Sequence, residues 1–148
     1  MMEDINNDGY KLKCTCRNIR MTARVTTQYF DKIFLKAGMK AAQFALLSDI
    51  SSHGTISINE LADILLMDQT TVTRNIENLK KLNYVHVEQG RDLRKKYVSI
   101  SKIGHAKLQE ALPLWVEAQK FLIREIGEEK YEDFLNTLYK IQQLTGNS

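Results

Sequence analysis

Apolar side chains recur every three or four residues along most of this chain, which is the spacing of one face of an α-helix. Residues 17–36 follow this pattern and stop before Gly38, and they predict a long first helix. Residues 41–51 follow it again and run into a cluster of serine and glycine, which predicts a second, shorter helix. The N-terminal third of the chain is therefore expected to be helical.

Two further helices are predicted close together by their capping residues. Ser57 followed by Glu60 is a capping box, so a helix is expected to begin at Ile58. Asp68 is a typical N-cap residue for the next helix, which requires the preceding helix to end near Met67. A short helix, a tight turn and a second helix are the layout of a helix-turn-helix.

The second of these helices, at about residues 69–82, has one apolar stripe and one polar face. Val72, Ile76 and Leu79 share the stripe, which predicts that it is buried. The first turns of the polar face and its flanks hold the candidate DNA-binding residues of this helix, Gln69, Thr70, Thr71, Thr73 and Arg74. Amides and hydroxyls bind base edges or phosphates, and the forked donors of arginine fit guanine. A polar face that only meets solvent is the alternative.

After this helix the period of the pattern changes from that of a helix to that of a strand. In YVHVE and again in YVSIS, valine or isoleucine alternates with polar residues, which predicts two short strands. The segment between them begins near Gly90 and is long enough for an extended hairpin. Residues 84–101 are therefore interpreted as a wing that follows the helix-turn-helix.

The positive charges of the chain gather in the same segment. Residues 69–102 hold eight cations and three anions, a local charge of +5 in a chain whose net charge is +3. Residues 1–68 are balanced, and residues 103–148 carry −2. Such cations repel one another but are stabilised beside phosphates or in a narrow minor groove. The predicted hairpin holds four of them, the candidate DNA-binding residues Arg91, Arg94, Lys95 and Lys96. A basic face that is only solvated is the alternative.

Helical periodicity returns in the last third of the chain. Pro113 is expected to break or bend a long helix, and a final amphipathic helix is expected after Gly127. Neither terminal helix has an obvious apolar partner in a core as small as the winged segment. The sequence therefore predicts a mainly α (α+β) fold, in which residues 1–36 and 103–148 form a helical dimerisation domain and residues 40–102 form a winged helix-turn-helix DNA-binding domain. Helices that only cover the core of a single chain are the alternative.

The composition argues against several classes of protein. No apolar run approaches the roughly 18 residues of a membrane span, and the polar start lacks the apolar core of a signal peptide. A cytoplasmic protein without membrane contact is therefore expected. The sequence has no glycine-rich phosphate loop, no HExxH and no G-x-S-x-G, and its three histidines are isolated. Neither catalysis nor a cofactor is expected.

Two cysteines, Cys14 and Cys16, lie one residue apart near the N-terminus. A disulfide scaffold is excluded in practice, because a bridge between such near neighbours is strained and fastens no loop. A zinc site would need two more ligands from histidines that show no paired spacing, so no metal is expected. A redox-responsive regulator that uses these two thiols remains an alternative.

The order of the predicted elements resembles the MarR family of bacterial and archaeal transcriptional regulators, over roughly residues 12–145. The matching segments are QFALL, then SINELADILLMDQTTVTRNIENLKKLNYV through the helix-turn-helix, then GRDLRKKYVSISKIG through the wing. One position departs from the family: where many relatives have glycine before the first wing strand, this chain has Asn83, which also tolerates a left-handed backbone. Three pairs that recur in the family are, in this chain, Thr73 with Arg74, Asp92 with Arg94, and Ser101 with Gly104.

The resemblance implies a homodimer that places two recognition helices in successive major grooves of a pseudo-palindromic operator in double-stranded DNA, with the wings in the flanking minor grooves. It implies that Asp92 orients Arg94 and does not itself meet the DNA, because phosphates would repel a carboxylate. It also implies a repressor that a small aromatic or phenolic effector releases, although no residue marks the effector pocket. A winged-helix module that binds an acidic protein is the competing hypothesis.

Overall fold

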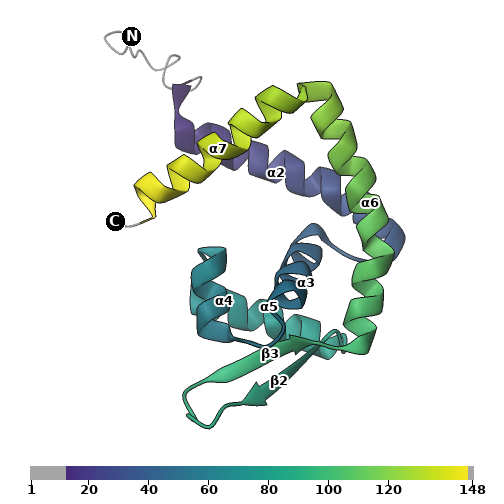
Figure 1. Ribbon diagram of the computed structural model, residues 1–148, viewed down its shortest axis with the longest axis vertical. Helices are drawn as coiled ribbons and strands as arrows, with labels where there is room; N and C mark the ends of the chain where they lie inside the picture. The colour runs from purple at the N-terminus through teal and green to yellow at the C-terminus, as the bar shows by residue number, and fades with distance from the viewer. Residues whose placement is uncertain (1–12, 147–148) are drawn as a thin grey trace.

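The order of elements in the structure follows the predicted order closely. A computed structural model describes residues 13–146 and is mainly helical, with one small sheet (Figure 1). Its elements are α2 (Thr15–Phe34), the short 3-10 helix η1 (Leu35–Ala37), α3 (Ala41–His53), β1 (Ile56–Ser57), α4 (Ile58–Leu65), α5 (Gln69–Lys81), β2 (Val85–Gln89), β3 (Lys96–Ile100), α6 (Lys102–Ile126) and α7 (Glu128–Thr145). The predicted fold class, a mainly helical winged helix-turn-helix, is confirmed. Residues 1–12 and 147–148, which belong to the predicted dimerisation domain, lie outside the described part.

Capping side chains fix the boundaries of the helix-turn-helix. Ser57 Oγ accepts a hydrogen bond from the Glu60 N–H at 3.1 Å, so α4 begins at the predicted residue. Leu66 ends α4 in a left-handed conformation with φ 54°. Asp68 then caps α5 by accepting from the Thr71 N–H at 2.8 Å. Only three residues therefore separate the two helices, and the predicted tight turn is confirmed.

The sheet has three antiparallel strands in the order β1-β3-β2. β2 and β3 form the predicted hairpin, with Val85 opposite Ile100 at one end and Gln89 opposite Lys96 at the other. β1, which pairs with β3, was not predicted. A strand of two residues is too short to show an alternating pattern, and both of its residues are buried, so the sequence around it carries no strand signal.

The core of the chain lies where α3, α4, α5 and the sheet meet the first half of α6. The predicted stripe of α5, Val72, Ile76 and Leu79, is buried there, as is Val98 of β3. Close packing of these side chains leaves the opposite face of α5 on the surface. The core therefore holds α5 and the hairpin in one fixed arrangement.

α6 runs from the sheet past α3 to the terminal helices α2 and α7 (Figure 1). It passes Pro113 without a break, so the alternative that this proline interrupts the helix is wrong. Pro113 is exposed, which lets the carbonyl that its missing N–H leaves unpaired turn toward water. Gly127, with φ 95°, separates α6 from α7. No helix within residues 13–146 is both long and apolar enough to cross a membrane.

Candidate nucleic-acid interface

Helix α5 presents most of its predicted site residues to solvent. Gln69, Thr70, Thr73 and Arg74 are all exposed within its first two turns, because the stripe on the other side of the helix faces the core. Amide, hydroxyl and guanidinium groups in these positions can donate or accept hydrogen bonds along a groove edge. The geometry brings these four side chains together as the sequence predicted, and binding itself remains a prediction.

Thr71 differs from the other four candidates because its polar atoms already have a partner. Its hydroxyl donates to Asp68 Oδ2 at 2.8 Å, its N–H donates to Asp68 Oδ1, and the residue is half-buried. The hydrogen bonds from the Thr71 N–H and hydroxyl hold the pKa of Asp68 below its ordinary value. Thr71 therefore fixes the start of α5, and only the lone pairs of its hydroxyl are free to accept from DNA.

The loop at the tip of the wing, residues 90–95, has a fixed shape despite its exposure. The Gly90 N–H donates to the Lys95 carbonyl at 2.8 Å, and the Lys95 N–H donates to the Asp92 carbonyl at 2.9 Å. The Gln89 side-chain amide donates to the carbonyls of Leu93 and Lys95. Sequence reasoning missed Gln89, because a bond from a side chain to a distant carbonyl leaves no pattern along the chain.

Asp92 and Arg94 are bonded to each other at this tip. Asp92 Oδ1 accepts from the Arg94 N–H and from Arg94 Nε, each at 3.1 Å, and Oδ2 accepts from a terminal guanidinium nitrogen at 3.3 Å. These bonds lower the pKa of Asp92. The Arg94 side chain is nevertheless 90% exposed, so its outer N–H groups remain available. The contact that the resemblance implied is therefore present in the free protein.

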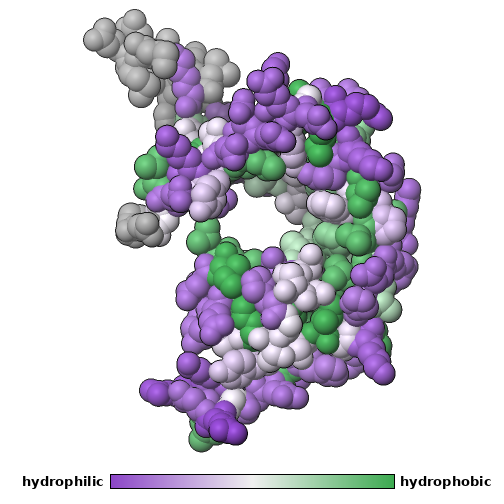
Figure 2. Space-filling view, in the orientation of Figure 1, coloured by the Kyte–Doolittle hydropathy of each residue, from purple (hydrophilic) through white to green (hydrophobic). Residues whose placement is uncertain are grey.

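The other three cations of the wing, Arg91, Lys95 and Lys96, are exposed. Within residues 13–146 they form no ion pair at 4.0 Å or less. Figure 2 shows a wing covered mostly by hydrophilic residues. An exposed hairpin with this surplus of positive charge can attract phosphate groups, an interaction that carries no sequence information.

A close backbone contact joins the base of the wing to α6. Ser101 Oγ donates to the Asn83 carbonyl at 2.6 Å and accepts from the Gly104 N–H at 2.9 Å. A Cβ atom at Gly104 would overlap the carbonyl of Tyr84, so no side chain fits there. Asn83 has φ 61°, a left-handed conformation that asparagine tolerates. The end of α5, the start of β2 and the start of α6 are thereby held together.

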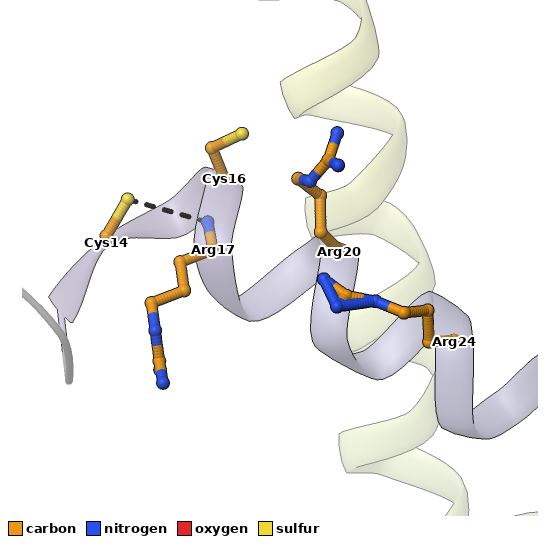
Figure 3. Close-up of a pocket in the computed structure, with 5 residues that line it drawn as sticks. All are labelled: Cys14, Cys16, Arg17, Arg20 and Arg24. Atoms are coloured by element: carbon orange, nitrogen blue, oxygen red, sulfur yellow. Dashed lines mark hydrogen bonds between the residues drawn. The ribbon is translucent and has the colours of Figure 1, made fainter.

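The two cysteines lie at the start of α2 (Figure 3), away from all the candidate DNA-binding residues, which belong to α5 and the wing. Cys14 Sγ accepts from the Arg17 N–H at 3.5 Å and caps the helix, and the two sulfurs are not bonded to each other. With Arg20 and Arg24 they line an open hollow. No group of three metal-ligating side chains occurs within residues 13–146. The two thiols form no disulfide, and the redox alternative is not favoured.

Comparison with known proteins gives the same assignment as the geometry. The sequence model of the MarR family matches residues 37–95. The M. tuberculosis transcriptional regulator MosR, solved in complex with DNA, is 30% identical; the match covers 90% of this chain and 99% of MosR, with a TM-score of 0.79. A mutant E. coli MarR solved with operator DNA has the same fold, with 20% identity, coverage of 89% and 96%, and a TM-score of 0.80.

A relative in sequence, the uncharacterized HTH-type transcriptional regulator YwoH of Bacillus subtilis, is 25% identical over 116 residues, which are 78% of this chain and 85% of YwoH. The family match spans the helix-turn-helix, β2 and the charged loop at the tip of the wing, and it ends before β3. The structural matches extend the similarity to the helices on either side. The chain belongs to the MarR family of transcriptional regulators and has their winged helix-turn-helix DNA-binding fold.

Proposed function

We propose that this protein is a sequence-specific regulator that binds double-stranded DNA as a homodimer and represses transcription from a pseudo-palindromic operator. The observation that carries this proposal is the pairing of two exposed features on adjoining elements, the polar face of α5 and the cationic loop of the wing. Each is held by a network of caps and loop hydrogen bonds before any DNA is present. A preformed site loses little conformational entropy on binding.

The polar face of α5 and the cationic loop of the wing have different roles in recognition. Gln69, Thr70, Thr73 and Arg74 enter the major groove and read base edges, since their groups match the donors and acceptors displayed there. Thr71 holds the helix start, and its hydroxyl, which donates to Asp68, accepts a hydrogen bond from a base amino group. The remaining candidates act through the wing: Arg91, Lys95 and Lys96 contact phosphates, and Arg94, oriented by Asp92, enters the minor groove.

The homodimer is supported by the apolar surface that the chain leaves uncovered on its terminal helices. α7 has no buried residue, and its Phe134, Leu135 and Tyr139 are exposed. Val25, near the middle of α2, is exposed as well. Figures 1 and 2 show the far ends of these helices standing away from the winged core, to which α6 and the C-terminal end of α2 join them along one side. A second copy that packs on these faces would bury them and would set the spacing of two recognition helices.

We also propose that a small aromatic or phenolic effector releases the protein from its operator DNA. α2 meets α3 through stacked rings: the centroids of Phe30 and Phe34 lie 5.9 Å apart, and those of Phe34 and Phe44 lie 4.4 Å apart. This row joins the dimerisation helices to the DNA-binding part. A ligand that repacked it would tilt one part against the other and would change the distance between the two recognition helices.

The experiment that tests the proposal is selection of bound duplexes from a random DNA pool, followed by the salt dependence of affinity for the selected site. We expect an inverted repeat with half-sites about one helical turn apart and a steep salt slope. Recovery of no motif, with weak binding that salt abolishes, would overturn the proposal and would favour a module that uses its basic wing on an acidic protein.

A further inference from the structure

One apolar side chain stands at the tip of the charged wing. Leu93 is 82% exposed, which is the largest exposed fraction of any large apolar side chain in the described part of the chain. Figure 2 shows hydrophobic surface at the end of the otherwise hydrophilic wing. Single exposed apolar residues are common on protein surfaces, so exposure alone carries no function. Leu93 differs from the others because it lies among the cations that are expected to contact DNA.

The loop holds Leu93 outward in a defined position. The Lys95 N–H donates to the Asp92 carbonyl, so Leu93 and Arg94 are the two central residues of a tight turn. The Gln89 side chain holds the Leu93 carbonyl from inside the loop. The Leu93 side chain belongs to no core cluster, so it contributes nothing to the fold. Its presentation is therefore fixed while its surface stays in water.

A DNA minor groove offers an apolar surface that suits such a residue. The walls of the groove are deoxyribose rings, and hydrophobic side chains are used by several minor-groove proteins to contact them or the base steps. Arg94, next to Leu93 in the turn, is drawn to the negative potential of a narrow minor groove. A turn that brings Arg94 into the groove brings Leu93 with it.

We propose that Leu93 is a DNA-contacting residue that enters the minor groove beside Arg94 and packs its side chain against the deoxyribose walls. This inference rests on the proposed DNA-binding function and adds an apolar contact to a wing that otherwise acts through charge. A phosphate contact and an apolar contact depend on salt concentration in different ways. Loss of a phosphate contact reduces the salt slope by about 0.9, whereas loss of an apolar contact weakens binding at every salt concentration and leaves the slope unchanged.

A lysine at the same position reverses the sign of the expected effect. If the tip binds DNA through charge alone, Leu93→Lys adds a cation and tightens binding with a steeper salt slope. If Leu93 packs against sugars, the same substitution removes the apolar contact and places an ammonium group that must stay hydrated, so binding weakens on the selected site.

The test uses the duplex selected by the unaltered protein, extended by A/T-rich flanks for both wings, and measures dissociation constants by fluorescence anisotropy over a range of salt. We expect Leu93→Ala to weaken binding roughly tenfold per wing, Leu93→Met to restore most of the loss, and Leu93→Lys to bind less tightly than leucine. Lys96→Ala is the matched control and should flatten the salt slope.

An unchanged affinity for Leu93→Ala, or a tighter complex for Leu93→Lys, would overturn the inference while leaving the proposed function intact. A protein that selects no duplex at all would overturn both together. Because Leu93 packs against no part of the core, thermal unfolding of all three variants should match that of the unaltered chain, which separates a lost DNA contact from a damaged fold.

Discussion

The winged helix-turn-helix and the two terminal helices differ in whether the chain itself buries their apolar faces. In the winged part, Leu61, Ile76 and Val98 are fully buried by the chain itself. In α7, a helix of 18 residues with a clear amphipathic pattern, no residue is buried and Leu135 is 46% exposed. An amphipathic pattern therefore predicts that an apolar face is buried, but it does not show whether the same chain or a second chain buries it. One region is complete in a single copy, and we propose that the other is completed by a second.

The largest expected effect falls on the complete region. Ile76→Ala removes a fully buried side chain from the stripe of α5 and should lower the free energy of unfolding by about 2–5 kcal/mol. Ile103→Ala, an exposed isoleucine at the start of α6, is the matched control and should change it by less than about 0.5 kcal/mol. Chemical denaturation measures both. Similar losses for the two variants would contradict the assigned core.

The incomplete region is tested by placing a charge on the exposed apolar face of α7. Leu135→Asp should weaken self-association at least about a hundredfold, because an unpaired carboxylate would be buried between the copies. Asn136→Asp adds the same charge at the neighbouring, polar position and should leave association nearly unchanged. Sedimentation equilibrium gives the dissociation constants. Equal behaviour of the two variants would show that this face of α7 is not an interface.

The joint between the wing and α6 is tested at Gly104. Gly104→Ala places a Cβ against the Tyr84 carbonyl, and the backbone must shift to admit it. We expect a loss of about 1–3 kcal/mol in the free energy of unfolding, with weaker DNA binding because the wing moves. His105→Ala alters the exposed neighbour and serves as the control. A Gly104→Ala protein as stable as the unaltered one would mean that this close contact is not needed.

Within the binding surface, alanine substitutions at Arg74 and Lys96 are expected to reduce DNA affinity in different ways. Arg74→Ala should cost on the order of 1–3 kcal/mol on the selected site and little on random DNA, because it removes a base contact. Lys96→Ala should weaken both complexes alike by removing a phosphate contact. Binding titrations on the two duplexes measure this difference. Equal losses on both duplexes for Arg74→Ala would show that Arg74 holds phosphate only.

The smallest effect is a pH dependence at the cap of α5. The pKa of Asp68 is lowered in the folded protein, so its carboxylate contributes stability that is present above the ordinary aspartate range. That contribution is lost as pH falls through the lowered folded pKa. The difference in stability between the unaltered protein and Asp68→Ala should therefore be constant from pH 7 to about pH 5 and should shrink below about pH 4. A difference that grows on acidification would contradict the sign.

Local chemistry explains how much of the fold could be predicted from the sequence. Ser57 and Asp68 marked two helix starts because capping is a property of a few neighbouring residues, and alternation marked β2 and β3 for the same reason. β1 could not be predicted, because it depends on pairing with a strand distant along the chain. The unbroken course of α6 could not be predicted either, because it depends on the exposure of Pro113 in the folded chain.

The candidate site follows the same division. Residue type and spacing indicated the exposed groups of α5 and the cations of the wing, because amphipathic position and charge can be read along the chain. Two contacts could be seen only in the structure. The Thr71 hydroxyl donates to Asp68, and the Gln89 side chain donates to carbonyls of the loop. Those contacts decide which of the polar groups are free to meet a ligand.

We propose that the surface formed by α5 and the wing reads DNA sequence in addition to binding phosphate charge. The most direct measurement compares the affinities of the unaltered protein for its selected inverted repeat and for a scrambled duplex of equal length and composition, at about 150 mM salt. We expect the affinity for the selected repeat to exceed that for the scrambled duplex by a factor of about a thousand or more. A ratio near one, with both complexes lost as salt is raised, would contradict it.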